Sequence, residues 1–236
     1  MKHASADTMK REAAQAALSA VETNMKLGLG TGSTAAYFVE YLGARVKEGL
    51  KIICVPTSER THMQAAALGI PLSTLEETPE LDLTIDGADE FDLSRRLIKG
   101  GGGALLREKI VAAASKRMFV IADATKEVKT LGAFPLPIEI DRFGAKSTRL
   151  HIERVARGLG LAGSIIQRLN KDSSPFITDG GHFIYDCSFG VIDDPEMLAQ
   201  RLSNIPGVVE HGLFIDLATA IFVASAEGVR IIGETK

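Results

Sequence analysis

The sequence predicts an α/β protein built on a parallel sheet, with a smaller α+β region inserted before the last strands. Short apolar runs alternate with segments of helical periodicity up to about residue 130, which is typical of βαβ units with right-handed crossovers. The alternation breaks at Phe134-Pro-Leu-Pro137, and strand-like runs return between residues 208 and 232. We therefore expect one domain formed by residues 1–130 and 207–236, and a second formed by residues 131–206.

The elements of the first part follow from periodicity and from stop and start signals. Alanines recur at helical spacing with Leu18, Gly49 is a plausible helix stop, and Thr57 or Ser58 is a candidate N-cap. Expected helices cover residues 9–21, 35–48, 57–69 and 104–115, and expected strands begin at residue 25 and cover 51–55, 81–85 and 118–122.

The second part is predicted to be a compact α+β insert. Asp194 and Pro195 are suited to the N-cap and first turn of a helix that ends near Leu202, and Gly180-Gly181 is suited to a hairpin turn. The other expected elements are a helix over 147–159 and strands over 138–140, 175–178 and 182–187. The tail from residue 208 offers strands that could return to the main sheet.

Composition limits the possible functions. The 236 residues carry a net charge of −3, which argues against a general nucleic-acid binder, because that role needs a basic face. No apolar run is long enough to span a bilayer, and the N-terminus lacks an export signature. Cys54 and Cys187 both lie in strand-like runs, so two buried free thiols and a cytoplasmic location are expected. The histidines are scattered, so no metal site is expected.

The stretch from Asp82 to Lys109 concentrates the groups that proton transfer needs. It holds clustered carboxylates, Lys99, four consecutive glycines and Glu108 in the helix that follows. The carboxylates are Asp82, Asp86, Asp89, Glu90 and Asp92. Converging like charges raise one another's pKa, which is how proteins prepare acids and bases. The alternative is a solvated acidic turn followed by a flexible linker.

The glycine-rich turn Gly28–Thr34 follows a strand and precedes a helix. Its third glycine comes one residue early for a dinucleotide fingerprint, and the second strand ends without the acid that the fingerprint requires. A P-loop needs a lysine before the serine, and Gly32-Ser33 has none. Backbone N–H groups and the hydroxyls of Thr31, Ser33 and Thr34 instead suit a single phosphate. A capped tight turn is the structural alternative.

Two further polar clusters follow predicted strands. One contains Thr57, Ser58 and Thr61, and the other contains Asp123 and Lys126. In a parallel sheet they lie at the same carboxyl edge as the glycine-rich turn and the acidic stretch, where open α/β sheets bind ligands. Their shared position at this edge is a stronger argument for a ligand site than any one cluster.

These motifs together resemble the ribose-5-phosphate isomerase type A family. The blocks that carry the resemblance are Gly30-Thr-Gly-Ser-Thr34, Thr57-Ser58, Asp86-Gly-Ala-Asp-Glu90, Lys99-Gly-Gly-Gly-Gly-Ala-Leu-Leu-Arg-Glu-Lys109, Ala122-Asp-Ala-Thr-Lys126 and Pro206-Gly-Val-Val-Glu-His-Gly-Leu-Phe214. The resemblance covers nearly the whole chain. It implies a Rossmann-like domain with a smaller α+β domain, in a cofactor-free cytosolic enzyme that forms dimers or tetramers. The implied reaction interconverts ribose 5-phosphate and ribulose 5-phosphate in the non-oxidative pentose phosphate pathway.

The resemblance also implies a role for each residue of the site. Glu108 is then the general base, while Asp86, Asp89 and Lys99 surround the reacting oxygens. The implied substrate-binding residues are Lys10, Thr31, Gly32, Ser33, Thr34, Gly87, Ala88, Gly100, Gly101, Gly102 and Lys126. No role follows for Asp82, Glu90 or Asp92.

One block departs from the family pattern, and two other classes of protein compete with the isomerase. Thr178-Asp-Gly-Gly-His182 ends in histidine where the family often has asparagine, which puts details of the insert in doubt. A sugar-phosphate sensor would carry a DNA-binding domain, for which the single helix before Met25 leaves no room. A CoA-transferase would use its glutamate as a nucleophile instead of a base.

Overall fold

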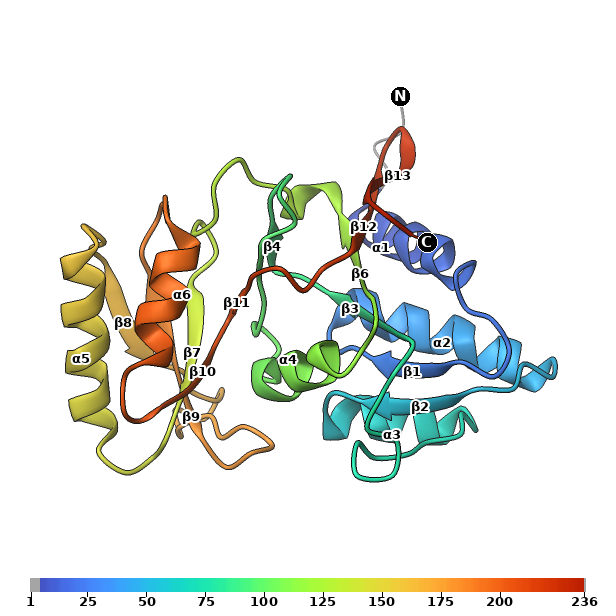
Figure 1. Cartoon of the computed structure of the whole chain (residues 1–236), viewed down its shortest axis with the longest axis horizontal. Coiled ribbons are helices and arrows are strands. Elements are labelled where there is room, and N and C mark those ends of the chain that lie inside the picture. Colours follow the sequence, from blue (N-terminus) through green and yellow to red (C-terminus); the bar gives the residue numbers. More distant parts are fainter. Residues whose placement is uncertain (1–4, 236) are drawn as a thin grey trace.

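Within residues 5–235, which the computed structural model describes, the largest sheet has the strand order β13-β12-β6-β3-β1-β2 (Figure 1). Its strands are β1 (Lys26–Leu29), β2 (Ile53–Pro56), β3 (Leu83–Gly87), β6 (Met118–Asp123), β12 (Ala220–Ser225) and β13 (Gly228–Gly233). All neighbouring pairs are parallel except β12 and β13. The carboxyl ends of β1, β2, β3 and β6 therefore meet at one edge.

Both faces of this sheet are covered, as a parallel sheet requires. Helices α1 (Ala6–Leu18), α2 (Ser33–Lys47) and α3 (Glu59–Ala67) pack on one face, and α4 (Leu105–Ala113) lies on the other with β4 (Glu90–Phe91), β5 (Leu97–Ile98) and β11 (Leu213–Phe214). Side chains of β6 alternate between the two cores: Phe119 and Ile121 join the first, and Met118 and Val120 join the second.

The smaller region contains an antiparallel sheet covered by two helices, on the left in Figure 1. The sheet has the order β10-β7-β9-β8, and α5 and α6 pack against it. The bounds are β7 (Leu136–Ile140), α5 (Ala145–Gly158), β8 (Ser164–Gln167), β9 (Phe183–Ser188), α6 (Pro195–Ser203) and β10 (Val208–His211). Asp194 caps α6 by accepting the Met197 N–H at 2.9 Å, which confirms the predicted helix start.

The structure differs from the expectations for the small region and the tail in three places. Residues 175–178 form no strand; Pro175 makes an isolated bridge to Leu169. The turn at Gly180-Gly181 exists, but β9 pairs with β7 and with β8, a strand that the sequence analysis missed. In the tail, β12 and β13 return to the main sheet as expected, whereas β10 pairs with β7. Strand-like composition shows that a segment suits a sheet but not which strand it pairs with, because the pairing depends on how the rest of the chain packs.

The predicted fold class is confirmed: a mostly parallel α/β sheet with a smaller α+β region inserted before the C-terminal strands. The predicted domain limits at residues 130 and 207 remain predictions. Cys54 and Cys187 are buried free thiols, as expected. In residues 5–235, no helix combines the length and the apolar character needed to cross a membrane.

Candidate active site

A cavity opens at the carboxyl edge of the main sheet, where the sequence predicted that the motifs would meet. Its walls come from the loops after β1, β3 and β6, from α1, and from the segment between β5 and α4. The lining residues are Lys10, Thr31, Gly32, Ser33, Thr34, Gly87, Ala88, Asp89, Lys99, Gly100, Gly102, Glu108 and Lys126. Asp86 and Gly101, also predicted for the site, do not line the cavity but contact residues that do: Asp86 is buried beside Lys99, and the exposed Gly101 donates its N–H to Asp89.

Lys99 is the centre of a buried group of charges. Its Nζ donates a hydrogen bond to the Gly87 carbonyl at 2.6 Å, and it lies 3.0 Å from Asp86 Oδ2 and 3.4 Å from Glu108 Oε2. The three charged side chains are at most 3% exposed. Burial by itself lowers the pKa of Lys99, but the Asp86 and Glu108 carboxylates outweigh it and raise that pKa. The ammonium therefore stays charged between two carboxyl groups.

Glu108 lies one turn inside α4 and lines the cavity. Burial raises the pKa of Glu108 to about 8; Asp86 and Asp89 add to this effect, and Lys99 opposes it. Glu108 Oε2 makes no hydrogen bond to any residue from 5 to 235, although Lys99 lies within ion-pair distance. A carboxyl with such a pKa and a free oxygen can accept and return a proton near neutral pH.

Asp86 and Asp89 are held by backbone donors of the surrounding loops. Asp86 Oδ1 accepts the Thr31 N–H at 3.0 Å and the Gly87 N–H at 2.7 Å. A Cβ on Gly30 would lie 2.1 Å from that oxygen, so the first loop can pass Asp86 only with glycine at position 30. Asp89 is partly exposed.

The other end of the cavity is built around the N-terminus of α2. Gly32, with φ of 126°, precedes the helix without a side-chain cap, which leaves the first N–H groups of the helix open to an anion. Ser33 and Thr34 occupy the first helical positions, and Lys10 and Lys126 line the same cavity. Lys126 ends a 3-10 turn (Ala124–Lys126) that Asp123 caps.

The hydroxyl of Thr31 is already occupied by protein partners. Thr31 Oγ1 lies 2.7 Å from both Thr57 Oγ1 and Ser58 Oγ, and 3.0 Å from Thr61 Oγ1. Thr61 Oγ1 also donates to the Gly30 carbonyl at 3.0 Å. The hydroxyls that follow β2 therefore form a buried network that fixes the glycine-rich turn, and they do not line the cavity.

The acids without a predicted chemical role bind other parts of the chain. Asp82 accepts the Lys26 N–H at 2.9 Å, beside the start of β1. Glu90 is buried and accepts the Gly132 N–H at 2.7 Å. Asp92 accepts backbone N–H groups of its own turn at 2.9 and 3.0 Å. Two kinds of carboxylate thus lie in one stretch, and residue type alone did not separate them.

The sequence analysis missed residues of the small region that contact the glycine run. Arg168 Nη1 donates to the Gly100 carbonyl at 2.8 Å, 68 residues away in the sequence. The Phe176 ring packs against Gly103, where an added Cβ would lie 2.4 Å from the ring. No local motif marks these residues, because their partners are distant in the sequence.

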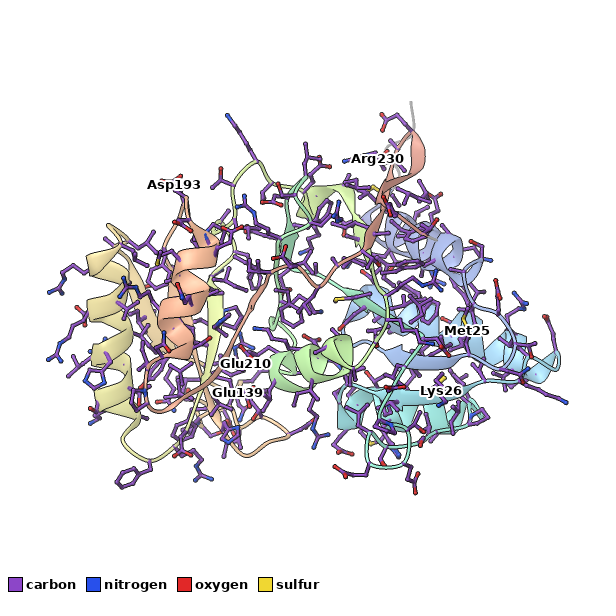
Figure 2. The ribbon with its side chains drawn as sticks, viewed as in Figure 1. Met25, Lys26, Glu139, Asp193, Glu210 and Arg230 are labelled. Atoms are coloured by element: carbon purple, nitrogen blue, oxygen red, sulfur yellow. The ribbon has the colours of Figure 1, made fainter. Side chains whose placement is uncertain are left out.

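The histidine that departs from the family pattern lies outside the cavity. His182 Nδ1 is 2.9 Å from Glu139 Oε1, a buried carboxylate that also accepts the Thr178 hydroxyl at 2.8 Å. Figure 2 shows Glu139 and Glu210 on the part of the small sheet that faces α4. Glu210 binds Lys109, with 2.6 Å between Nζ and Oε1. The departure therefore lies beside the contact between the small region and α4, since Glu139 and Thr178 face the start of that helix. Within residues 5–235, no histidine, cysteine and carboxylate side chains gather as a metal site would require.

Comparison with known proteins finds close sequence relatives over almost the whole chain. The family model described as ribose 5-phosphate isomerase A (phosphoriboisomerase A) matches residues 53–228. Ribose-5-phosphate isomerase A of Agrobacterium fabrum is 60% identical over 224 residues, which cover 95% of this chain and 96% of that protein. The protein of the same name from Bradyrhizobium diazoefficiens is 57% identical over 234 residues, with coverage of 98% and 97%.

Solved structures agree with the sequence relatives. Ribose 5-phosphate isomerase A from Methanocaldococcus jannaschii superposes with a TM-score of 0.90 at 37% identity, covering 98% of this chain and all of that one. A D-ribose-5-phosphate isomerase in complex with phospho-erythronic acid gives a TM-score of 0.91 at 37% identity, with the same coverage. The resemblance seen in the sequence is confirmed, and the chain belongs to the ribose 5-phosphate isomerase A family.

Proposed function

We propose that this chain interconverts D-ribose 5-phosphate and D-ribulose 5-phosphate, an aldose–ketose isomerisation of the non-oxidative pentose phosphate pathway. The observation that carries the proposal is a single cavity with two unlike ends. One end holds Glu108 and Lys99, and the other is the open N-terminus of α2 with two lysines beside it. A phosphorylated sugar has a reactive carbonyl end and an anionic end, and this cavity suits both.

Glu108 is the proposed general base. Isomerisation moves a proton between C2 and C1, so one group must take the proton and return it. A carboxyl with a pKa of about 8 and a free oxygen suits both steps. The glutamate of triosephosphate isomerase, a known case on an unrelated fold, performs the corresponding transfer.

Lys99 is the proposed electrostatic partner of the enediolate that forms during the transfer. Its buried ammonium and an N–H group of the glycine run that is not bound within residues 5–235 are donors already placed before the reaction, which is the arrangement that stabilises a developing oxyanion most strongly. Asp86 and Asp89 surround the same oxygens and assist ring opening. Gly87, Gly100, Gly101 and Gly102 let the main chain approach the sugar closely, because they carry no Cβ, and Ala88 lines the same part of the cavity.

The phosphate is proposed to bind at the N-terminus of α2. The backbone of Gly32, Ser33 and Thr34 supplies N–H groups, the two hydroxyls add donors, and Lys10 and Lys126 add positive charge. Thr31 contributes through its position in the turn, because its hydroxyl is bound to neighbouring hydroxyls.

No metal or cofactor enters this scheme, because Lys99 and backbone donors supply the charge stabilisation. The two buried thiols suit a reducing compartment, which supports a cytoplasmic location. A homodimer or homotetramer is implied by the family resemblance and remains a proposal. We also retain the proposed domains of residues 1–130 with 207–236 and of residues 131–206.

The activity is tested by incubating EDTA-treated protein with ribose 5-phosphate in D₂O and following the products by NMR. We expect ribulose 5-phosphate with deuterium at C1, because the proton on Glu108 exchanges with solvent between its removal and its return. Heat-denatured protein is the control. An absence of ketose would overturn the proposed activity. Ketose that stays free of deuterium at C1 over many turnovers would contradict the enediolate route.

A further inference from the structure

The run Gly100–Gly103 joins the two groups on which the proposed chemistry depends. Lys99 precedes it and Glu108 lies in the helix that follows. Gly100 and Gly103 have φ angles of 106° and 80°, which favour glycine, and four consecutive glycines lose much backbone entropy when they are ordered. The segment therefore needs fixed contacts from outside if its N–H groups are to be placed before the reaction.

Arg168, which directly follows β8 in the small region, supplies such a contact. Its Nη1 donates to the Gly100 carbonyl at 2.8 Å and to the Gly101 carbonyl at 3.3 Å. Its Nε and Nη2 bind the two carboxylate oxygens of Asp186 on β9, with the Nε contact at 2.9 Å. One edge of a rigid planar group is thus held by β9, and the other edge holds the glycine run.

The orientation of the glycine peptides follows from this contact. In a trans peptide the carbonyl and the N–H point in opposite directions. The peptide between Gly100 and Gly101 gives its carbonyl to Arg168 and its N–H to Asp89 Oδ2, at 2.7 Å. Arg168 and Asp89 therefore hold the two ends of one peptide, so a shift at Arg168 reaches Asp89 in the cavity wall.

The next peptide leaves a donor unpaired beside the cavity. Its carbonyl, on Gly101, also faces Arg168, so the Gly102 N–H points away from Arg168. Gly102 lines the cavity, and its N–H makes no hydrogen bond to any residue of the described range 5–235. An unpaired N–H at this place is suited to the developing oxyanion of the substrate.

We propose that Arg168 is a positioning residue for the isomerisation: it sets the two glycine peptides so that one holds Asp89 and the other presents the Gly102 N–H to the sugar. The inference rests on the proposed function. The small region thereby takes part in the site without lining the cavity. Phe176 supports the arrangement, because its ring packs against Gly103 and lies 5.8 Å from the Arg168 guanidinium carbon.

The test compares Arg168→Met and Arg168→Lys with the wild type and with Arg157→Met, an exposed arginine of α5 that pairs only with Glu153 among residues 5–235. We expect Arg168→Met to lower kcat by roughly 10²-fold, the loss associated with misplacing reacting groups by about 1 Å. Arg168→Lys should lower kcat by a smaller factor, because the ammonium keeps the positive charge. Some loss should remain, because an ammonium cannot hold the carboxylate and both carbonyls together. Arg157→Met should match the wild type.

Comparing the change in kcat with the change in KM separates positioning of the reacting end from a distortion of the whole cavity, with kcat calculated for the concentration of folded protein. KM for ribose 5-phosphate and the Kd of inorganic phosphate should stay within threefold, about 0.7 kcal/mol, of wild type, because the phosphate end makes no contact with Arg168. Wild-type kcat in folded Arg168→Met would overturn the inference, as would equal changes in kcat and phosphate affinity. If the Arg168 variants fail to fold, Asp186→Asn is the substitute test, because Asp186 holds the Arg168 guanidinium. An unchanged kcat in Asp186→Asn would also overturn the inference. An inactive wild type would instead overturn the proposed function.

Discussion

The two ends of the cavity hold charge by different physical means. At the reacting end, Lys99, Asp86 and Glu108 are nearly inaccessible to water, and their charges act on one another strongly. At the phosphate end, Lys10 and Lys126 are partly exposed, and the helix N-terminus supplies partial charges that solvent screens. The first arrangement changes pKa values and the second attracts an anion. Substitutions at the reacting end should therefore change kcat, and substitutions at the phosphate end should change KM.

The largest expected effect comes from Glu108→Gln. The amide keeps the shape of the side chain but cannot accept a proton from carbon, so kcat should fall by roughly 10²–10⁴-fold while KM changes little. Steady-state kinetics with ribose 5-phosphate measures both constants. Glu48→Gln, an exposed glutamate in a surface ion pair with Arg45, is the matched control. Turnover near the wild-type value would remove Glu108 from the role of base.

The dependence of kcat/KM on pH should come next in size. The base must be unprotonated to act, and its pKa in the free protein is about 8. We therefore expect kcat/KM to rise by about tenfold per pH unit up to that value and then to level off. The raised pKa of Lys99 keeps its ammonium charged across this range. The substrate phosphate titrates near pH 6 and should add a second, lower step. A profile that is flat between pH 6.5 and 8 would contradict the raised pKa.

Lys126→Ala tests the opposite end of the cavity and should have a smaller effect. Loss of a charge-assisted hydrogen bond to phosphate from a partly exposed lysine should raise KM by roughly tenfold and leave kcat almost unchanged. Lys129→Ala, an exposed lysine three residues later that does not line the cavity, should behave as wild type. An unaltered KM in Lys126→Ala would place the phosphate elsewhere.

The smallest kinetic effect is expected for Glu90→Gln, which changes an acid that lies beside the site without lining it. The Glu90 carboxylate accepts backbone N–H groups of Gly132 and Phe134, so the neutral amide should lower the free energy of unfolding by about 1–3 kcal/mol. Urea unfolding measures that loss. The values of kcat and KM should stay at wild type, and a large fall in kcat would show that neighbouring acids do not separate into structural and chemical groups.

Local signals predicted the elements of the main sheet well and those of the small region less well. The alternation of strands and helices, the cap at Ser58 and the Asp194-Pro195 helix start all depend on neighbours within four residues. The strand Ser164–Gln167 was missed because four residues are too few to show an alternation of apolar and polar side chains. Its pairing with β9 is evident only in the folded chain. Residues 175–178 have strand-like composition but no strand partner beyond one bridge.

For the site, the sequence determined which residue types meet, and the fold decided what each of them contacts. Parallel strands bring their carboxyl ends to one edge, so the loops after β1, β3 and β6 could be placed together from their order alone. Residue type alone could not separate Asp86 from Glu90, which only the family resemblance did, and no signal in the sequence pointed to Arg168 behind the glycine run. Those assignments depend on contacts between distant segments, because burial and hydrogen-bond partners, and with them pKa values and peptide orientation, arise only when the chain has packed.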